Sequence, residues 1–281
     1  MSAASRAIFA EWSLPVVLTG TLMILALIYM RGWFAIRKTR ESQFPVWRLG
    51  SFLLGLGIIW VAIASPLDGF ADVLLSAHMV EHLLLMSFAP PLLLLSWPVV
   101  PLLRGLPEGL TVYLLGPLIR IKLLRQLGHL LTMPLVAWLA MNLTFLGWHV
   151  PAAYDFALEH ERWHEFEHLC FLGTSIMFWW PLVRPWPTRA RYSGWMLLLY
   201  LVMADIVNTV LSAFLAFCDR PVYPYYVNEA NPFSISPLAD QRAGAVVMWV
   251  IGSLVFLIPA VVLTVRLLQQ KASSIRRAFR S

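Results

Sequence analysis

Charged residues are scarce in this sequence. Asp, Glu, Lys and Arg make up 13% of its 281 residues, whereas hydrophobic residues make up 59%. Soluble domains contain about a quarter charged residues, so the composition excludes an ordinary soluble domain. It predicts an all-α protein, a polytopic membrane helix bundle that forms a single transmembrane domain over residues 1–281.

Cysteine and lysine are nearly absent as well. Cys170 and Cys218 are the only cysteines and do not form a CxxC pair, which argues against a thiolate metal site or a disulfide framework. Lys38, Lys122 and Lys271 all lie outside the long apolar runs. A rhodopsin-like protein with a retinal Schiff base inside a span is therefore excluded.

Seven apolar segments are long enough to cross a bilayer, which takes about 20 residues. They cover approximately residues 13–30, 47–65, 71–96, 130–149, 164–183, 194–217 and 243–267. The third contains Pro90-Pro91, which should kink it or end it early. Residues 107–128 are broken by Gly and Pro and are expected to form an interfacial connection. Residues 218–242, rich in Pro and Tyr, are expected to fold over the outer helix ends.

Basic residues concentrate in alternate connecting segments, at 31–48, 104–125 and 184–191 and again after 266. The intervening segments hold most of the acidic residues. Because Lys and Arg mark the cytoplasmic side, the N-terminus is predicted outside and the C-terminus in the cytoplasm. The net charge of +6 then indicates topology and contact with anionic membrane lipid, and not binding to nucleic acid.

Two short stretches combine His and Glu at helical spacing. Residues 78–82 read HMVEH and residues 160–168 read HERWHEFEH, so both contain the pattern HxxEH. Side chains four residues apart lie on the same face of a helix. Each stretch therefore forms a row of two histidines and one glutamate, and both rows fall at the outer ends of their spans.

Other polar residues fall near the same side of the membrane. His149 ends the fourth predicted span, and Asp240 precedes the seventh. A carboxylate at membrane depth costs about 2.5–3.5 kcal/mol and usually has a partner and a function, which draws attention to Glu81 and Asp205. The sequence therefore predicts a metal site with the candidate ligands His78, Glu81, His82, His149, His164, His168 and Asp240, supported by Asp205, Glu167 and Met79.

The residues alone leave the metal open. Imidazole suits copper, zinc and iron, and a thioether such as that of Met79 suits Cu(I). We expect the two HxxEH rows to face each other and to form the walls of one outward-facing metal site.

The sequence resembles a known family over most of its length after about residue 50. The stretches HMVEHLLLMSFAPPLLLLSWP (78–98), GWHVPAAYDFALEHERWHEFEHLCFLGTSIMFWWPL (147–182) and SPLADQRAGAVVMWVIG (236–252) are similar to the integral-membrane CtaG proteins, the assembly factors of caa-type cytochrome c oxidase in bacteria. The family's first motif often has Gln where this chain has Glu81, so the resemblance does not make Glu81 an indispensable ligand.

The resemblance implies a multi-pass protein of the bacterial plasma membrane that handles copper and has cytochrome c oxidase subunits as partners. It assigns motif positions to His78, His82, His149, His164, His168 and Asp240. The expected function is assembly of the oxidase by binding and delivering copper, without catalysis.

Three alternatives stay open at this stage. An intramembrane zinc metallohydrolase would use one HxxEH pattern, with two His on zinc and the Glu on a water, and Asp205 as a further ligand. A haem-binding protein would hold iron between paired histidines. A structural protein would use the same residues only to tie helices together. A homo-oligomer is compatible with the sequence, as is a monomer.

Overall fold

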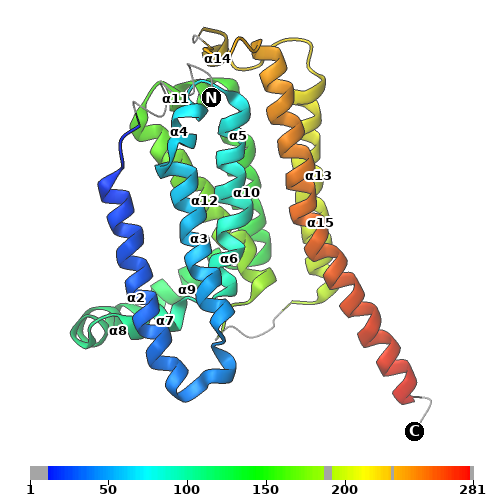
Figure 1. Cartoon of the computed structure of the whole chain (residues 1–281). Coiled ribbons are helices and arrows are strands. Elements are labelled where there is room, and N and C mark those ends of the chain that lie inside the picture. The colour runs from blue at the N-terminus through cyan, green and yellow to red at the C-terminus, as the bar shows by residue number, and fades with distance from the viewer. Residues whose placement is uncertain (1–11, 187–191, 229–230, 279–281) are drawn as a thin grey trace.

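The computed structural model describes residues 12–186, 192–228 and 231–278, and these residues form helices connected by short loops without any strand (Figure 1). Residues 1–11, 187–191, 229–230 and 279–281, which include the predicted outer N-terminus and part of the basic segment 184–191, lie outside the described residues. The longest helices are α2 (Val16–Arg40), α3 (Val46–Ala64), α10 (Pro134–Trp148), α12 (Glu161–Val183), α13 (Gly194–Phe217) and α15 (Pro237–Ala278).

Within the described residues, five helical segments are long and apolar enough to cross a membrane, or six if the bent pair α9 (Lys122–Leu131) and α10 counts as one span. α12 has sufficient length with 23 residues, but the polar residues of its HxxEH row lower its hydropathy. The all-helical, multi-span fold is thus confirmed. The count of seven spans and the orientation in the membrane stay predictions.

The third span is continuous despite Pro90-Pro91. It runs through α5 (Leu75–Leu83), a π-helical turn η2 (Leu84–Phe88) and α6 (Ala89–Leu95), and it is long and apolar enough to cross as one unit. Pro90 has no N–H with which to bond the carbonyl of Met86 four residues earlier. The indole N–H of Trp179 on α12 donates to that carbonyl instead, at 3.1 Å. The wider turn and this side-chain donor explain why the helix does not end at the prolines.

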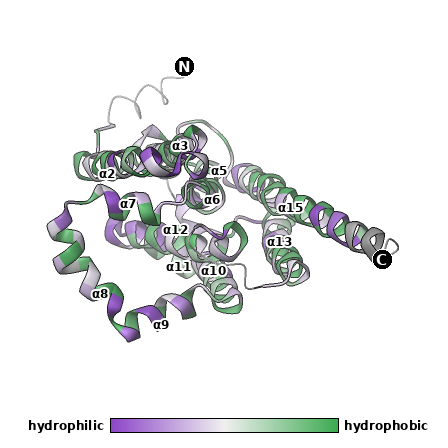
Figure 2. Cartoon of the chain, turned by 90° about the horizontal axis from the view of Figure 1, so that it is seen from below, coloured by the Kyte–Doolittle hydropathy of each residue, from purple (hydrophilic) through white to green (hydrophobic). Residues whose placement is uncertain are grey.

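The third span also joins two groups of buried apolar residues. Leu85 and Ala89 pack with α2 and α3, whereas Met79 and Met86 pack with α10, α12, α13 and α15. Seen along the bundle, α5 and α6 lie between these two groups of helices (Figure 2). Residues of the third span are consequently the most enclosed of all candidate spans.

Short helices occupy both ends of the bundle. At one end α7 (Val99–Gly105), η3 (Leu110–Leu115), α8 (Gly116–Arg120) and α9 form the connection to α10, and α8 and α9 extend beside the bundle (Figures 1 and 2). This agrees with the prediction that residues 107–128 do not form a span. At the other end lie α4 (Pro66–Ala71), α11 (Pro151–Leu158) and α14 (Pro224–Asn228).

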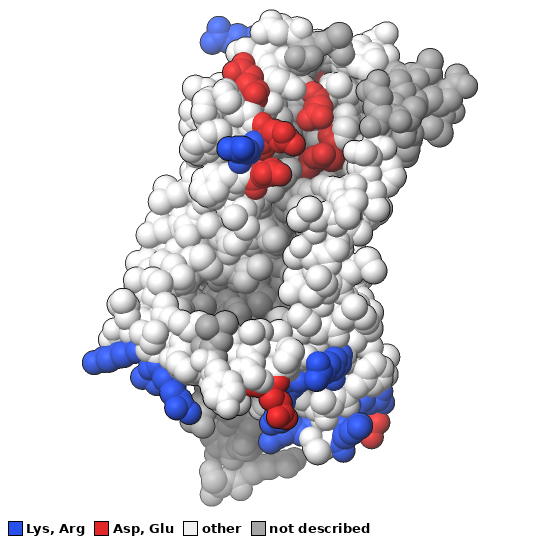
Figure 3. Space-filling model, turned by 90° about the vertical axis from the view of Figure 1, so that its left-hand side faces the viewer, with Lys and Arg blue, Asp and Glu red and all other residues white. Residues whose placement is uncertain are grey.

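Charge is distributed unevenly along the bundle. On the face shown in Figure 3, acidic side chains gather near one end and most of the visible Lys and Arg side chains lie near the other. The middle of this face shows no Lys, Arg, Asp or Glu side chain. Large hydrophobic side chains such as Leu27 on α2, Leu139 on α10 and Phe214 on α13 are exposed on the long helices. An exposed apolar belt between two polar ends is the surface expected of a protein in contact with lipid.

Candidate metal centre

The two HxxEH rows lie face to face on α5 and α12. Within each row the imidazole rings are one helical turn apart, with ring centroids 4.2 Å apart for His78 and His82 and 4.3 Å apart for His164 and His168. Across the two helices, His78 lies 5.1 Å from His164 and His82 lies 5.6 Å from His168. The predicted facing arrangement of the rows is therefore present in the structure.

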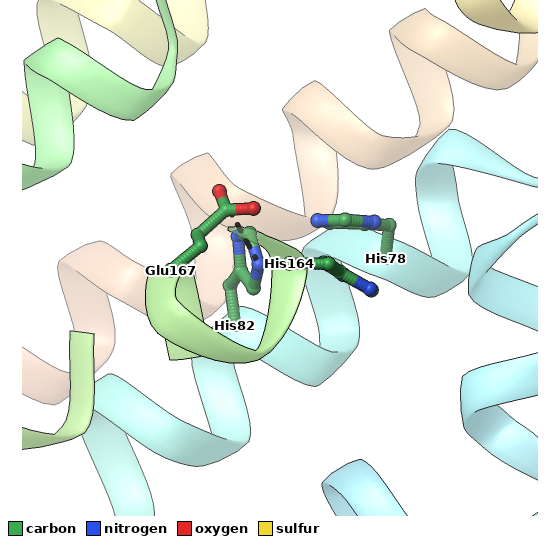
Figure 4. Close-up of side chains that lie close together, drawn as sticks. All are labelled: His78, His82, His164 and Glu167. Carbon is green, nitrogen blue, oxygen red and sulfur yellow. Dashed lines mark ion pairs between the residues drawn. The ribbon is translucent and has the colours of Figure 1, made fainter. Parts of the chain in front are cut away.

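Each glutamate contacts a histidine of the opposite row. Glu167 Oε1 lies 3.8 Å from His82 Nε2, and Glu81 Oε1 lies 3.2 Å from His168 Nε2. The contacts are reciprocal because both rows present the same spacing to each other. Figure 4 shows the carboxylate of Glu167 beside the ring of His82, with His78 and His164 alongside.

The six side chains form two overlapping groups with the geometry of a metal site. In the first group, His78, His82, His164 and Glu167 each offer one ligand atom, and these atoms all lie within 4.8 Å of one another. The second group has the same property and consists of Glu81, His164 and His168. Since His164 belongs to both groups, an ion could move from one to the other without leaving the set. We refer to these six residues together as the histidine–glutamate cluster.

The cluster is buried, and most of its polar atoms have no hydrogen-bond partner. Five of its residues are buried, with exposures from 0% for His78 and Glu81 to 8% for His168, and only His164 is partly exposed. No hydrogen bond reaches His78 Nε2, either ring nitrogen of His82, the Nε2 atoms of His164 and His168, either carboxylate oxygen of Glu81, or Glu167 Oε1. Because a buried polar group without a partner is costly, this donor set fits a bound cation.

Tyr226 on α14 determines which nitrogen of His78 is available. Its hydroxyl donates to the carbonyl of Ala71 at 2.8 Å and lies 3.3 Å from His78 Nδ1. Burial raises the pKa of Tyr226 well above its usual value, so the hydroxyl keeps its single proton. His78 must therefore donate from Nδ1–H to the tyrosine oxygen, which leaves Nε2 with a free lone pair toward the cluster.

Sequence reasoning did not identify Tyr226 or its neighbours as site residues. Tyr154 on α11 lies 5.1 Å from His78 between ring centroids, and the hydroxyl of Tyr223 donates to the carbonyl of His149 at 3.3 Å. The available signal was the Tyr-rich composition of residues 218–242, which were expected to cover the outer helix ends. Helix α14 of this segment lies at that end of the bundle (Figure 1).

Asp240 is not part of the cluster. Its carboxylate accepts hydrogen bonds from the backbone N–H groups of Leu75 at 2.6 Å and Ser76 at 3.3 Å, and from the hydroxyl of Ser76 at 2.5 Å. It thus caps the N-terminus of α5 from the neighbouring helix α15. The close approach of the two helices depends on Gly244, where a Cβ would lie 3.2 Å from Met79 Cγ.

The remaining predicted residues, His149, Met79 and Asp205, are not members of the two ligand groups. His149 is buried, and its Nδ1 lies 2.7 Å from the carbonyl of Phe145. Met79 is buried beside His82 and lines a small cavity that His149 also lines. Asp205 on α13 is half-buried, belongs to neither group, and has one carboxylate oxygen without a hydrogen bond.

Acidic residues lie near the end of the bundle that holds the cluster. Burial, together with the negative charges of Asp72 and Glu161, raises the pKa of Asp68 to about 6, so these three carboxyl groups are near neighbours. A group of negatively charged carboxylates on a surface raises the local concentration of cations there. On another side, His168 and Glu165 border an apolar cavity of about 640 Å³.

Comparison with known proteins identifies one family over most of the chain. The model of the family described as cytochrome c oxidase caa3 assembly factor (Caa3_CtaG) matches residues 27–270. Uncharacterised proteins of Mycobacterium bovis and Mycobacterium tuberculosis are each 27% identical over 281 residues, covering 96% of this chain and 40% of the relative. An uncharacterised protein of Mycobacterium leprae is 26% identical over 278 residues. The chain thus spans about two fifths of the length of these relatives, and no solved structure matches it.

Proposed function

Because the chain belongs to the family of cytochrome c oxidase caa3 assembly factors, we propose that it serves oxidase assembly by binding copper at the histidine–glutamate cluster and passing it to an oxidase subunit. In this proposal the protein is not an enzyme, works in the bacterial plasma membrane, and presents the cluster on the outer side of the bilayer. The family membership supports oxidase assembly, and the cluster supplies the argument for copper.

The observation that carries the copper proposal is the set of unpartnered, buried donor atoms. Four imidazoles and two carboxyl groups meet within a few ångströms, and most of their ring nitrogens and oxygens have no hydrogen-bond partner. Nitrogen and oxygen donors of this kind bind Cu(II) more tightly than other divalent ions of the first transition row. Tyr226 adds support because it leaves Nε2 of His78 unprotonated, the form in which imidazole binds metals.

The overlap of the two ligand groups suits transfer better than permanent storage. Both groups need His164, so the cluster would hold one ion in either of two positions instead of a closed cage around a fixed ion. His164 is also the one partly exposed member, and it would be the residue that first meets an entering ion. The acidic groups Asp68, Asp72 and Glu161 would attract cations to this end of the bundle.

The test is the metal content of the purified protein. Wild type, a His78→Ala/His82→Ala variant and a His129→Ala control are purified in detergent, loaded with Cu(II), freed of excess metal and measured by mass spectrometry. His129 lies on α9, outside both ligand groups, and its loss should leave the copper content unchanged. We expect near-stoichiometric copper in wild type and control, and strong loss in the double variant.

Other outcomes would contradict the proposal. Zinc retained in preference to copper would favour the metallohydrolase, and an absence of metal from every sample would leave the cluster with a structural role. A second measurement tests delivery: cells that carry the double variant should assemble an oxidase with less copper and less activity than cells with the His129 control. Normal oxidase in those cells would refute delivery through the cluster.

A further inference from the structure

A small cavity lies next to the histidine–glutamate cluster and shares His82 with it. The cavity measures about 30 Å³ and is enclosed by residues of α5, η2, α10, α13 and α15. Fourteen residues line it, among them the two histidines His82 and His149 and four methionines. This volume has room for one or two water molecules or for a metal ion.

We propose that this cavity is a second metal site, which takes a soft monovalent cation of the Cu(I) class on the Nε2 atom of His149 and the surrounding methionine thioethers. The site would exist whether or not the histidine–glutamate cluster holds copper, so the inference goes beyond the proposed function and does not depend on it.

His149 provides the first argument because only one of its tautomers is compatible with its surroundings. Its Nδ1 lies 2.7 Å from the backbone carbonyl of Phe145. A carbonyl oxygen can only accept, so Nδ1 carries the proton and Nε2 carries a lone pair. His149 is 94% buried, and its Nε2 has no hydrogen-bond partner. Because His149 lines the cavity, this buried nitrogen without a hydrogen-bond donor is the atom that the residue can offer to a metal ion.

The methionines provide the second argument. Met79, Met86, Met141 and Met248 supply four of the fourteen lining residues, although the whole chain has only 11 methionines among 281 residues. Fourteen positions taken at random would contain fewer than one. The four come from separate elements, α5, η2, α10 and α15, so their convergence arises from the packing of the bundle. Thioethers select soft cations such as Cu(I) over divalent ions.

The backbone around Met86 is unusual, and it fixes the direction in which this side chain points. Met86 and Ser87 both belong to the π-helical turn η2, and such turns occur frequently at functional sites. The indole N–H of Trp179 bonds the carbonyl of Met86 and so holds this turn against α12. Without the extra residue in the turn, Met86 would be rotated relative to the rows on α5.

The cavity lining contains no acidic residue, and this favours a monovalent ion over a divalent one. None of the fourteen lining residues is a carboxylate, and the polar ones besides the two histidines are Ser87, Asn142 and Asn208. A divalent ion would keep both of its charges uncompensated in this apolar enclosure, which is far more costly than one charge. The neighbouring cluster differs because it contains Glu81 and Glu167. His82 borders both sites, and neither of its ring nitrogens has a hydrogen-bond partner.

X-ray absorption at the metal edge tests the proposal directly on the wild-type protein. Purified full-length protein in detergent is loaded without oxygen with one equivalent of Cu(I), and in a parallel sample with Ag(I). The expected spectrum has sulfur neighbours together with imidazole nitrogen. A spectrum with nitrogen and oxygen neighbours only would overturn the proposal, and it would do so without reference to any variant.

Variants then locate the site. Met86→Leu/Met141→Leu keeps side-chain volume and should weaken Cu(I) binding, measured by competition with a chromogenic chelator, on the order of 10- to 100-fold. The matched control is Met196→Leu/Met203→Leu, because both of these methionines are exposed on α13. His149→Phe should remove the nitrogen neighbour from the spectrum. Equal binding by wild type, the Met86/Met141 variant and the control would refute the assignment.

A cluster variant separates this inference from the proposed function. His164→Ala/His168→Ala removes two cluster ligands, neither of which lines the cavity, and it should lose Cu(II) while it keeps the Cu(I) signal with sulfur neighbours. If wild type binds Cu(I) with sulfur neighbours but never loads Cu(II), the proposed function fails and the second site stands. If Cu(II) loads normally and Cu(I) shows no sulfur neighbour, the second site fails and the proposed function stands.

Discussion

Replacing Asp240 with alanine is expected to destabilise the start of α5 without removing a metal ligand. The carboxylate accepts three hydrogen bonds at that point, from the N–H of Leu75 and from the N–H and hydroxyl of Ser76. Asp240 itself is only 3% exposed, so water cannot readily take over as the acceptor. His78 follows Leu75 by less than one helical turn, and the effect should therefore reach the cluster.

The size of the effect can be worked out from these bonds. A side-chain N-cap contributes about 0.5–2 kcal/mol, and each buried donor left without an acceptor costs about 1–3 kcal/mol. For Asp240→Ala we expect a loss of about 2–4 kcal/mol in the free energy of unfolding. Asp240→Asn keeps one oxygen acceptor and loses the charge, so about half of that loss is expected.

The assay is equilibrium unfolding in mixed micelles with increasing sodium dodecyl sulfate, followed by tryptophan fluorescence, together with copper content of the folded protein. Ser236→Ala is a suitable control because the exposed Ser236 caps the start of α15 nearby, where its hydroxyl accepts from the N–H of Ala239. Copper loading of Asp240→Ala should stay within about tenfold of wild type. If the variant unfolds like wild type yet loses copper as completely as the His78/His82 double variant, Asp240 is a ligand and the capping argument is wrong.

Three further predictions concern residues around the cluster and the third span. Tyr226→Phe removes the hydroxyl that orients His78 and should weaken copper binding on the order of 10- to 100-fold in a chelator competition. An unchanged copper affinity would argue against the assigned tautomer of His78. Asp68→Asn should raise the stability at pH 7 by about 1–2 kcal/mol after allowance for its partial exposure. The sign follows because the folded pKa of Asp68, about 6, lies above its ordinary value of 3.8: folding favours the protonated acid, so its contribution is complete below about pH 4 and is lost as pH rises through 6. Unfolding measured from pH 4 to 7 should be less pH-dependent in the variant, and equal slopes would contradict the assignment. Trp179→Phe leaves the carbonyl of Met86 without a donor and should cost about 1–3 kcal/mol in the same unfolding assay, with Trp195→Phe, at an exposed position, as the control.

The sequence was sufficient to predict the helical bundle and the two rows. A length of apolar chain near 20 residues leaves helices as the solution for a backbone in lipid, and the i, i+4 spacing puts His78 and His82 on one face whatever surrounds them. These inferences need only local geometry. The number of spans was harder to predict because α12 combines an apolar body with a polar row, and composition describes such a helix poorly.

The roles of individual polar residues depended on contacts between distant segments. The sequence gives the same signal for Asp240 whether it binds a metal or caps a helix. The structure shows that its carboxylate accepts a hydrogen bond from the N–H of Leu75, 165 residues away in the chain, and so caps α5. The sequence predicted His149 at the same side of the membrane as the cluster. In the structure His149 follows the end of α10 and lines the methionine-containing cavity. Tyr226 reaches His78, 148 residues away in the chain, only because α14 packs against the end of the bundle.

By itself, then, the sequence determined a membrane bundle of helices, the spacing of two HxxEH rows, and membership of an oxidase assembly family. The tertiary structure decided that the rows face each other, that each glutamate contacts a histidine of the opposite row, and that four methionines surround the cavity beside them. The physical reason is that periodicity specifies direction within one helix, whereas contact between helices depends on their rotation, depth and closeness, which are set by packing at positions such as Gly244.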